Sequence, residues 1–471
     1  MPFARFAQPE TRRSLTDLSF TPFWLDDPAR PDPAEPLSRQ TTADLAIVGA
    51  GFTGLWAALL AKQSHPEWDV VLLERETTAC AASGRNGGFV SASLTHGFEN
   101  GLTRWPQEMP CLVALGHRNL NEMEADLQRW GIVCDWVRSG ELHVATEPYQ
   151  VAELRQAVEA GRRVGEQVEW LESEQTRNLV NSPTYLGAYL DHNVAMVNPA
   201  QMAWGLRAAC LQVGVRLYEQ TPVLSMHAEK AGVRLRTPHG DTLAARVALA
   251  TNAFPPLLKR LSLYIVPVYD YVLVTEPLSA TQWQQIGWQG REGVGDSGNQ
   301  FHYYRRTADG RILWGGYDAI YYPNNGVGPQ FEVNQESFER LAEHFFQTFP
   351  QLRGVHFTHG WGGAIDTCSR FSAFWGTALG GRVAYSLGYT GLGVGASRFG
   401  AKVLLDLLER RETERTRLMM ARYKPIPFPP EPFRSLVIHL TRASLDQADR
   451  NEGRRNAWLK LLDALGLGFD S

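Results

Sequence analysis

Residues 45–74 read LAIVGAGFTGLWAALLAKQSHPEWDVVLLE, and this stretch decides the fold. The short apolar runs 45–48 and 70–73 predict two buried strands. Between them, a glycine-rich turn leads into an apolar segment that predicts a helix ending near Gln63. Strand, helix and strand within about 30 residues are typical of a βαβ unit with parallel strands. The sequence therefore predicts an α/β fold.

The turn in this unit has the glycine spacing of a dinucleotide-binding loop. Gly49 permits a tight turn, Gly51 lets the main chain approach a pyrophosphate, and Gly54 lets the helix pack closely on the strand. The helix N-terminus offers free N–H groups and the positive end of its dipole to the phosphates. Glu74 follows Gly54 by 20 residues, where an acid would bond ribose hydroxyls. We therefore predict dinucleotide binding rather than a purely structural turn.

A second glycine cluster, SGRNGGF at 83–89, follows the second strand. Its adjacent glycines, Gly87 and Gly88, would let the main chain lie against a flat ring or a phosphate. Arg85 could pair with a pyrophosphate, and Asn86 could bond either a cofactor or the main chain. A turn with a solvated arginine explains the same residues equally well.

A third glycine-rich loop, 388–395, lies between a predicted strand at 383–387 and a predicted helix that ends near Arg410. A helix N-terminus at this place would stabilise the anionic reduced ring of a flavin. NAD would not need a distant C-terminal loop of this kind. A second packing turn is the competing interpretation.

Composition narrows the class of protein. The chain has 471 residues, 44% of them hydrophobic, and a formal net charge of −4, so it can form a packed core but lacks the basic surplus of a general nucleic-acid binder. Its five cysteines have neither CxxC nor metal-ligand spacing, which favours free thiols in a reducing compartment. Residues 1–20 contain no apolar signal segment. We therefore expect a soluble cytoplasmic protein without a metal site.

The remaining pattern predicts a Rossmann-like cofactor domain interleaved with a mixed-sheet substrate domain, followed by a helical C-terminal tail. Two amphipathic helices, at about 435–449 and 454–465, are expected to pack on their own chain or at a dimer interface, ahead of membrane-surface contact. The predicted segments are an extended lead-in at 1–40, the cofactor domain at 41–100, 186–260 and 355–410, the substrate domain at 101–185 and 261–354, and a Pro-rich linker with helices at 411–471.

A predicted hairpin supplies candidate substrate contacts. Asp309-Gly310 joins two strand-like runs at 301–305 and 311–315. Side chains alternate between the faces of a strand, so Arg305 and Arg306 point to opposite faces and only one can line a pocket. That arginine would pair with a substrate carboxylate, whereas a solvated hairpin face is the alternative for each.

Aromatic side chains supply a second set of candidates. Tyr269 and Tyr271 share one face of their strand, and tyrosine rings could hold an amine cation before it loses a proton. Ordinary sheet core is the competing interpretation for each tyrosine. His96 and His302 are isolated histidines that need not touch a cofactor. The candidate catalytic residues are Tyr271, His302, Tyr303 and Arg305.

Together these features resemble the D-amino acid oxidase superfamily of flavoproteins over residues 40–410. The cluster at 83–88 is most similar to the gamma-glutamylputrescine oxidase and glycine or sarcosine oxidase branch, which often has Gln where this chain has Phe89. The resemblance implies FAD, a two-domain fold and oxidation of a C–N bond. It rests on the unit 49–74, the segment 80–89, WGGAID at 361–366 and the loop 388–393.

The resemblance also implies particular contacts. The main chain at Val223 would meet the adenine. Cys368 lies near a position where some relatives attach flavin covalently, but the register is poor, so we expect non-covalent FAD and a buried apolar cysteine. With the motifs above, the predicted cofactor contacts are Gly49, Gly51, Phe52, Thr53, Gly54, Glu74, Arg75, Ser83, Gly84, Arg85, Asn86, Gly87, Gly88, Phe89, Val223, Thr251, Asn252, Trp361, Gly388, Gly391, Leu392 and Gly393.

The function that follows is oxidation of an amine or amino acid. A neutral amine would pass hydride to flavin N5, the resulting imine would hydrolyse, and O2 or a quinone would reoxidise the flavin. Two alternatives stay open: an NAD(P)H-dependent flavin hydroxylase or reductase, and an RNA-directed flavoprotein. A second GxGxxG after a strand, which the first would need, is missing from the sequence, and the acidic balance argues against the second.

Overall fold

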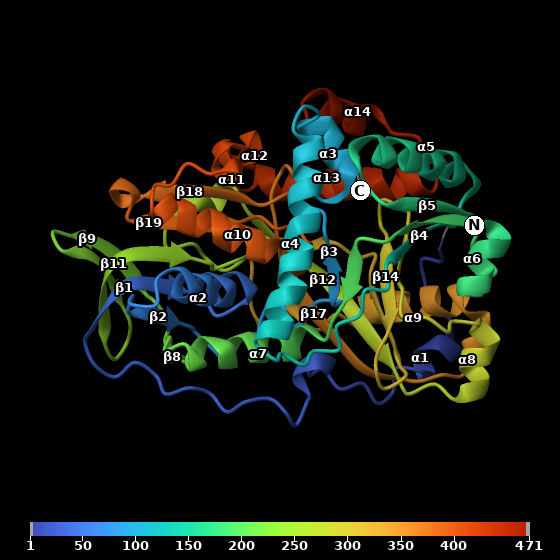
Figure 1. Ribbon diagram of the computed structural model, residues 1–471. Helices are drawn as coiled ribbons and strands as arrows, with labels where there is room; N and C mark the ends of the chain where they lie inside the picture. Colours follow the sequence, from blue (N-terminus) through green and yellow to red (C-terminus); the bar gives the residue numbers. More distant parts are fainter. Residues whose placement is uncertain (1–2, 468–471) are drawn as a thin grey trace.

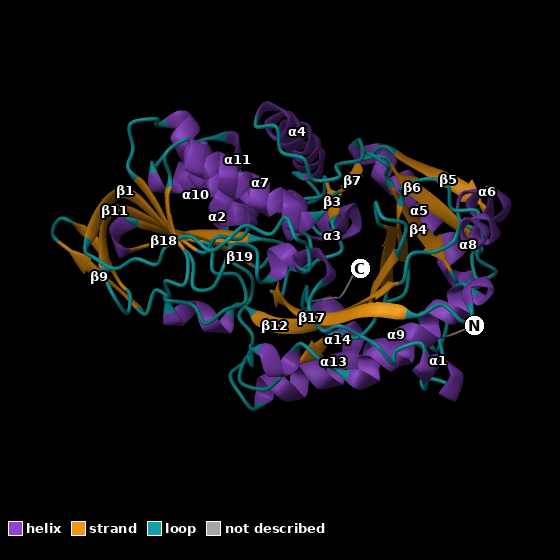
Figure 2. Cartoon of the chain, turned by 90° about the horizontal axis from the view of Figure 1, so that it is seen from below, coloured by secondary structure: helices purple, strands orange, loops and turns teal. Residues whose placement is uncertain are grey.

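The computed structural model describes residues 3–467. Figure 1 shows two large sheets side by side, one containing β1 (Thr41–Val48) and the other containing β14 (His302–Arg306), with the long helix α4 (Met109–Arg129) in front of the region where they meet. Helices cover the outer side of each sheet in the view of Figure 2. The predicted α/β architecture with a helical C-terminal region is confirmed.

The first sheet has eight strands in the order β18-β19-β11-β1-β2-β8, with β9 and β10 as an added hairpin. Its centre is parallel, since Ile47 lies opposite Leu72 on one side and Ala248 on the other. Its strands are β1 (Thr41–Val48), β2 (Val70–Leu73), β8 (Arg216–Tyr218), β9 (Ser225–Glu229), β10 (Gly232–Arg236), β11 (Asp241–Leu249), β18 (Phe374–Ala378) and β19 (Val383–Leu387).

The first βαβ unit forms as its sequence predicts. Both strands are buried along their apolar runs, and the helix between them, α2 (Phe52–Ser64), ends one residue after the predicted end. Helix α2 packs against α7 (Pro199–Gln212) and α10 (Gly393–Leu408). Asn198 caps α7 by accepting a hydrogen bond from Gln201 N at 3.1 Å, with Pro at the first helical position. Local sequence signals therefore place the elements of the cofactor side.

The second sheet has nine strands in the order β16-β12-β15-β14-β13-β4-β6-β5, with β17 paired to β12. The predicted hairpin is confirmed, because Tyr303 lies opposite Gly315 in antiparallel register. Its strands are β4 (Glu141–Ala145), β5 (Val168–Glu172), β6 (Gly187–Asp191), β12 (Val266–Thr275), β13 (Gly293–Asp296), β14 (His302–Arg306), β15 (Ile312–Gly316), β16 (Ile320–Tyr321) and β17 (Phe357–Thr367).

Two of these strands differ from the predicted domain segments. We expected residues 186–260 and 355–410 in the cofactor domain, yet β6 and β17 hydrogen-bond in the nine-stranded sheet. Strand β17 is the continuation of the substrate sheet that leads the chain back to β18 and β19 of the first sheet. The chain thus passes between the two large sheets more often than the predicted segments imply. The domain boundaries remain a prediction.

A third sheet has two antiparallel strands, β3 (Phe89–Ser91) and β7 (Val194–Met196), and lies between the two larger sheets in Figure 2. The other helices are α1 (Pro9–Arg13), α3 (Gly97–Arg104), α5 (Pro148–Val164), α6 (Ser173–Leu179), α8 (Ala280–Ile286), α9 (Gln335–Thr348), α11 (Glu414–Arg417), α12 (Met419–Arg422), α13 (Phe433–Asp449) and α14 (Ala457–Ala464). Short 3-10 turns lie at Phe23–Leu25, Ala82–Gly84, Lys259–Leu263, Pro329–Phe331, Pro350–Leu352 and Leu379–Gly381.

The N-terminal segment departs from the extended lead-in that we expected. It contains α1, and Leu15 and Trp24 are buried in two of the hydrophobic clusters. Trp24 Nε1 also donates to the main-chain oxygen of Asn86 at 2.8 Å. The lead-in is therefore part of the core and supports the second glycine loop.

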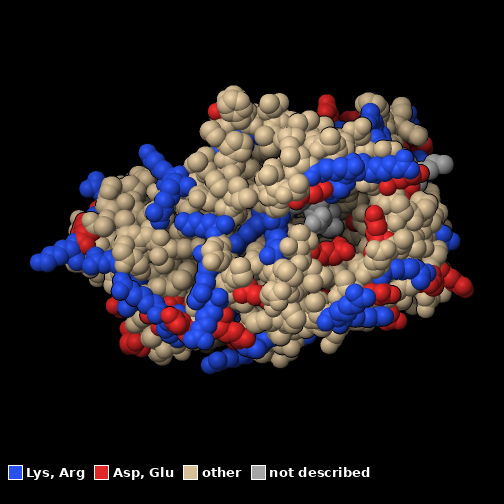
Figure 3. Space-filling model, turned by 90° about the horizontal axis from the view of Figure 1, so that it is seen from above, with Lys and Arg blue, Asp and Glu red and all other residues tan. Residues whose placement is uncertain are grey.

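The surface gives two further observations. Lysine and arginine side chains cross the middle of the face seen in Figure 3, with acidic side chains among them. Among residues 3–467, the helices all lack the combination of length and apolar character that crossing a membrane requires.

Candidate active site

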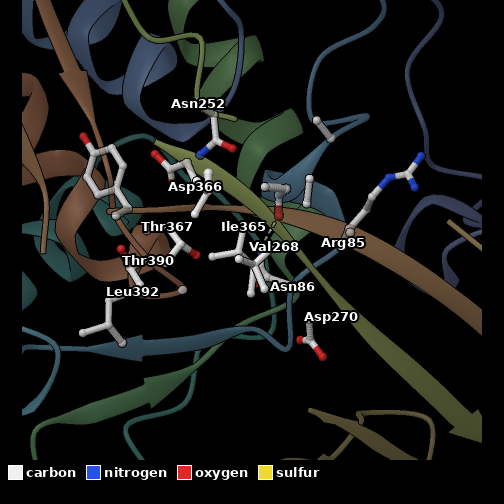
Figure 4. Close-up of a pocket in the computed structure, with 18 of the residues that line it drawn as sticks. Arg85, Asn86, Asn252, Val268, Asp270, Ile365, Asp366, Thr367, Thr390 and Leu392 are labelled. Atoms are coloured by element: carbon white, nitrogen blue, oxygen red, sulfur yellow. Dashed lines mark hydrogen bonds between the residues drawn. The ribbon is translucent and has the colours of Figure 1, made fainter. Parts of the chain in front are cut away.

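One cavity of about 740 Å³ is lined by residues of both large sheets. It extends from the loops after β1 and β2 to β4, β12 and β14, and the C-terminal segment 426–467 contributes part of its wall. Figure 4 shows a section of the lining, with Asn252 and Thr390 on one side and Arg85 and Asp270 on the other. Such a cavity can hold an extended cofactor at one end and a substrate at the other.

The first glycine loop is shaped by close main-chain contacts. Gly49 has φ +104°, and a Cβ there would lie 2.5 Å from the main-chain oxygen of Ala250. A Cβ on Gly54 would lie 1.8 Å from the oxygen of Gly49, so Gly54 serves helix packing and does not line the cavity. Gly51, at the N-cap of α2, does line it. The N-terminus of α2 therefore opens into the cavity, where it can bind a phosphate.

Glu74 lies where β2 ends, beside this loop. Its Oε2 accepts a hydrogen bond from Ala50 N at 2.7 Å, and its Oε1 accepts one from Glu76 N at 2.9 Å. Burial raises the pKa of this carboxyl above its usual value. Because Glu74 still lines the cavity, it can both fix the loop and meet a ligand hydroxyl. Its neighbour Arg75 lines the cavity as well, with its guanidinium 4.2 Å from the ring centre of Phe254.

Hydrogen bonds fix the second loop to the first. Ser83 Oγ accepts from Phe52 N at 3.0 Å, which joins the loop to the start of α2. Asn86 donates through Nδ2 to the main-chain oxygens of Ala82 and Ser83, at 2.9 and 3.1 Å, and accepts through Oδ1 from Gly88 N at 2.8 Å. Of the two roles considered for Asn86, the structure shows the main-chain one.

Arg85 is turned away from the phosphate end. Its Nε donates to the main-chain oxygen of Cys80 at 2.7 Å, and its Nη1 forms an ion pair with Glu332 at 2.6 Å and a hydrogen bond to Gly362 O at 3.2 Å. Figure 4 shows its guanidinium pointing away from the other labelled side chains. Pairing with a pyrophosphate, which we considered from sequence, is therefore not supported. Trp361, which does not line the cavity, supports the same loop by donating to Arg85 O at 2.9 Å.

The third loop is tied to the first. Thr53 Oγ1 donates to Tyr389 Oη at 3.0 Å, and Gly388 N donates to Asp366 Oδ2 at 2.6 Å. Burial raises the pKa of Asp366 to about 7. Gly391 has φ +91° and no heavy atom within 4 Å of a Cβ position, so its main chain is open to the cavity beside the N-terminus of α10. Two helix N-termini thus face one cavity.

The cavity fits FAD in two respects: it offers main-chain N–H donors, and glycines leave parts of the main chain uncovered by side chains. Open N–H groups at α2 and α10 suit the pyrophosphate and the ring oxygens, and Gly51 and Gly391 leave room that a side chain would fill. The predicted cofactor contacts that line the cavity are Gly49, Gly51, Phe52, Thr53, Glu74, Arg75, Ser83, Arg85, Asn86, Gly87, Phe89, Val223, Thr251, Asn252, Gly391, Leu392 and Gly393. Those that shape it from behind are Gly54, Gly84, Gly88, Trp361 and Gly388.

Cys368 does not line the cavity. It is buried, its Sγ donates to the main-chain oxygen of Ser372 at 3.2 Å, and burial raises its pKa. A buried neutral thiol is a poor nucleophile, so this residue fits non-covalent binding of the cofactor.

The structure does not support the catalytic role predicted for Tyr271. It lies on the face of β12 away from the cavity, where its Oη donates to the main-chain oxygen of Phe331 at 2.8 Å and contacts Tyr322 Oη at 2.8 Å. Tyr269 shares this face, and its Oη accepts from Gly328 N at 3.0 Å. Both tyrosines belong to the sheet core, the interpretation that competed with substrate contact.

His302 also lies outside the cavity. Its Nδ1 is 2.6 Å from Asp296 Oδ2 and its Nε2 is 2.9 Å from His344 Nδ1, on the face of β14 opposite Tyr303. The ring is fully buried, so both nitrogens are engaged within the protein. A role in contact with substrate is therefore not supported.

Neither arginine of the hairpin lines the cavity. Arg305 is fully buried and donates through Nη1 to the main-chain oxygens of Val197 and Gly88, at 2.7 and 3.2 Å. Burial lowers its pKa to about 9. Arg306 lies over the ring of Trp283 at 4.3 Å on the opposite face. The expectation that one of them reads a substrate carboxylate is corrected: Arg305 holds the β3 loop, and Arg306 packs near the surface.

Tyr303 does line the cavity, and it leads to a residue that the sequence did not reveal. Its Oη donates to Asp270 Oδ2 at 2.6 Å, and Asp270 lines the cavity as well. Burial raises the pKa of Asp270 to about 6. The strand alternation that grouped Tyr269 with Tyr271 contains the signal, since Asp270 between them must face the other way.

Other residues that sequence reasoning missed also line the cavity. Glu141 on β4 is one, and burial raises its pKa to about 8. His96, which we had considered only as an isolated histidine, lines the cavity too, and burial lowers its pKa to about 4. The tail contributes Ile426 to Pro429, side chains of α13 such as Arg442, and Leu462 and Leu467. Packing of the tail on its own chain agrees with the prediction, but no sequence signal placed it at the cavity.

Comparisons with known proteins agree with this geometry. The sequence pattern of the family described as FAD dependent oxidoreductase matches residues 44–407. The chain is 32% identical over 394 residues to gamma-glutamylputrescine oxidoreductase of Escherichia coli, covering 81% of this chain and 87% of that protein. It is 22% identical over 335 residues to sarcosine oxidase subunit beta of Rhodobacter capsulatus, covering 69% and 74%.

The fold has solved counterparts. It matches glycine oxidase from Geobacillus kaustophilus with a TM-score of 0.66 and 23% identity, over 80% of this chain and 96% of that one. Fold and cavity thus define a dinucleotide-binding redox enzyme of the two-sheet type. The chain belongs to the FAD-dependent oxidoreductase family, so the predicted resemblance and the predicted FAD are confirmed.

Proposed function

We propose that this protein oxidises the C–N bond of an amine or amino acid, giving an imine that hydrolyses to a carbonyl compound. The observation that carries the proposal is the single cavity that connects the Gly49–Glu74 unit with the face of β12 and β14. The named relatives, an oxidoreductase of gamma-glutamylputrescine and a subunit of sarcosine oxidase, support the amine chemistry.

The residues of the chain have distinct roles in this proposal. The α2 and α10 N-termini, Glu74 and the bare main chain at Gly51 would hold the FAD, which supplies the two-electron oxidation when bound. Asp270 and Tyr303 would orient the substrate, and Phe89, whose ring packs edge-on against Tyr303 at 5.8 Å, would shield the reacting carbon from water. O2 or a quinone would then accept the electrons.

The thiols support a cytoplasmic location. All five cysteines are free, and burial holds the pKa of Cys134 and Cys210 at about 12. Unpaired cysteines are typical of a reducing compartment, which supports a cytoplasmic protein.

The experiment is anaerobic reduction of the purified holoenzyme. We expect the flavin absorbance to bleach with at least one member of a panel of primary amines, N-methyl amines and amino acids. NADPH serves as the control for an NAD(P)H-dependent hydroxylase or reductase. Bleaching by NADPH, with none by any amine or amino acid, would replace this proposal with that alternative.

A further inference from the structure

The cavity-facing side of the nine-stranded sheet carries a row of side chains that the strand pairing defines. Tyr303 lies opposite Gly315 on one side and Gly295 on the other, so all three share a face. Gly315 lies opposite Val272, which places Asp270, two residues earlier, on that face too. On the far side, Gly293 lies opposite Glu141. Two carboxylates therefore flank Tyr303 on the wall of the cavity.

Glycine makes the contact between Asp270 and Tyr303 possible. These residues come from β12 and β14, with β15 between them. A Cβ on Gly315 would lie 2.7 Å from Tyr303 Cζ, so the ring crosses β15 through space that only glycine leaves free. The Tyr303 hydroxyl thereby reaches Asp270 Oδ2, while Oδ1 accepts from Gly316 N at 3.1 Å. Asp270 is held by two neutral donors.

No cation of the described chain pairs with Asp270. The cationic side chains that line the cavity nearby are engaged elsewhere: Arg85 pairs with Glu332 at 2.6 Å, and Arg442 pairs with Asp318 at 2.7 Å. A carboxylate that opens onto a cavity without a cation is costly to keep in a folded protein, because burial disfavours its charge. A ligand that supplies the positive charge would remove that cost.

Glu141 also favours a positively charged ligand. Its nearest basic group is His143, 3.8 Å away, whose pKa burial lowers to about 4, so this imidazole is neutral at pH 7. Among residues 3–467, the substrate end thus has two carboxyl groups and no unpaired cation; Asp270 carries the charge at pH 7, and Glu141, whose pKa burial raises to about 8, becomes charged at higher pH. A substrate carboxylate would meet like charge here, and an ammonium group would meet opposite charge.

We propose that Asp270, held in place by Tyr303, binds the ammonium group of the substrate, and that this end of the cavity selects amines that lack a carboxylate. The inference rests on the proposed function and specifies its substrate class. Tyr303 bridges the two ends of the site, because a Cβ on Gly87 in the second glycine loop would lie 2.7 Å from its ring. Asp270 is therefore placed beside the loop at which the cofactor binds.

A purely structural role for Asp270 makes a different prediction. Asparagine has nearly the same shape: its Oδ1 can accept from Gly316 N, and its Nδ2 can donate to the Tyr303 hydroxyl, which then acts as the acceptor. Asp270→Asn therefore removes the charge and keeps the local structure. Loss of cation binding in this variant, with unchanged flavin content, distinguishes a binding role from a structural one.

The test is equilibrium titration of the holoenzyme with n-butylammonium and, separately, with butyrate, followed by the flavin absorbance and by calorimetry. We expect saturable binding of butylammonium and none of butyrate by the wild type, and at least tenfold weaker butylammonium binding by Asp270→Asn. The matched control is Asp309→Asn, which makes the same change on the exposed β14–β15 turn and should bind like the wild type.

Three results would overturn the assignment: no saturable butylammonium binding by the wild type, preferential butyrate binding, or equal butylammonium binding by the wild type and Asp270→Asn. Tyr303→Phe checks the geometry, because it should retain butylammonium binding within a fewfold while Asp270 stays charged. The two proposals can fail separately. Binding through Asp270 without bleaching by any amine would refute only the proposed oxidation, whereas amine bleaching with an unchanged KM in Asp270→Asn would refute only the ammonium site.

Discussion

The two ends of the cavity are built by different means. At the nucleotide end, main-chain groups line the cavity: glycines leave space, two helices present their N-termini, and Ser83 and Asn86 hold the loops. At the substrate end, side chains from separate strands meet across the sheet, as Asp270 and Tyr303 do. The first end depends on local sequence, whereas the second depends on which strands are neighbours in the sheet.

The largest expected effect concerns the nucleotide end. A valine at Gly51 would place its Cβ 2.8 Å from Ser83 Oγ and its methyl groups in the space for the pyrophosphate. We expect Gly51→Val to retain less than about a tenth of the wild-type FAD in a folded protein, because overpacking at a ligand contact excludes the ligand. The ratio of flavin to protein absorbance measures this. Full flavin occupancy, with folding confirmed by circular dichroism, would show that main-chain access at Gly51 is not needed.

Next in size is a stability effect where the two ends meet. Arg305→Met leaves the buried oxygen of Val197 without its donor, whereas the oxygen of Gly88 keeps a hydrogen bond from Val197 N at 2.9 Å. An unpaired buried group costs about 1–3 kcal/mol, so we expect a loss of that size in the free energy of unfolding, measured by urea denaturation. The matched variant Arg306→Met, on the outer face, should cost under about 0.5 kcal/mol. Equal effects in the two variants would contradict the assigned difference in burial.

The pH dependence of cation binding should be smaller and confined to the substrate end. Burial raises the pKa of Asp270 to about 6, so the carboxylate is charged above that pH and becomes neutral below it. Butylammonium affinity should fall by up to tenfold per unit below about pH 6, and it should rise only modestly above pH 7, where Glu141 ionises because its pKa is about 8. Tyr303 faces Asp270 with a pKa raised further above its usual value, and Asp318 is paired with Arg340 and Arg442. In Asp270→Asn this fall should vanish, and flavin content measured at each pH guards against cofactor loss.

The smallest expected effect separates the two carboxylates. Glu141 carries a pKa near 8, so it is mostly neutral at pH 7 and contributes less to binding of a single cation. Glu141→Gln should weaken butylammonium binding by about two- to threefold at pH 7, and by more at pH 9. Calorimetry at the two pH values measures this. A loss as large as that in Asp270→Asn at pH 7 would mean that the ammonium binds at Glu141 instead.

The parts of the site that sequence reasoning could predict are those made of consecutive residues. Gly49, Gly51 and Glu74 lie in one short unit, and their roles as turn, opening and acid depend on local conformation. Apolar runs predicted the strands in the same way, and capping residues such as Asn198 predicted where helices start. The third loop, which is distant in sequence and close in space, was predicted from its glycines between a strand and a helix, and it then contributed to the family resemblance.

The rest depended on tertiary packing. Alternation along β12 has two possible phases, and only the pairing with β15 and β17 shows that Asp270 faces inward and Tyr271 outward. Arg305 was predicted on the correct face, but the β3 loop covers it. The C-terminal helices contain no sequence motif that indicates where they pack, so their position in the cavity wall could not be predicted from the sequence.

Gly315 gives the site an evolutionary consequence. The residue contacts no ligand in our proposals, yet any side chain there would displace the Tyr303 ring, since even a Cβ would come within 2.7 Å of it. We expect a single Gly315→Ala exchange to push the Tyr303 ring to a new position in the cavity, and so to alter substrate preference although residue 315 itself contacts no substrate. Homologues with the same substrate-binding residues but a different residue at this position would then prefer different amines.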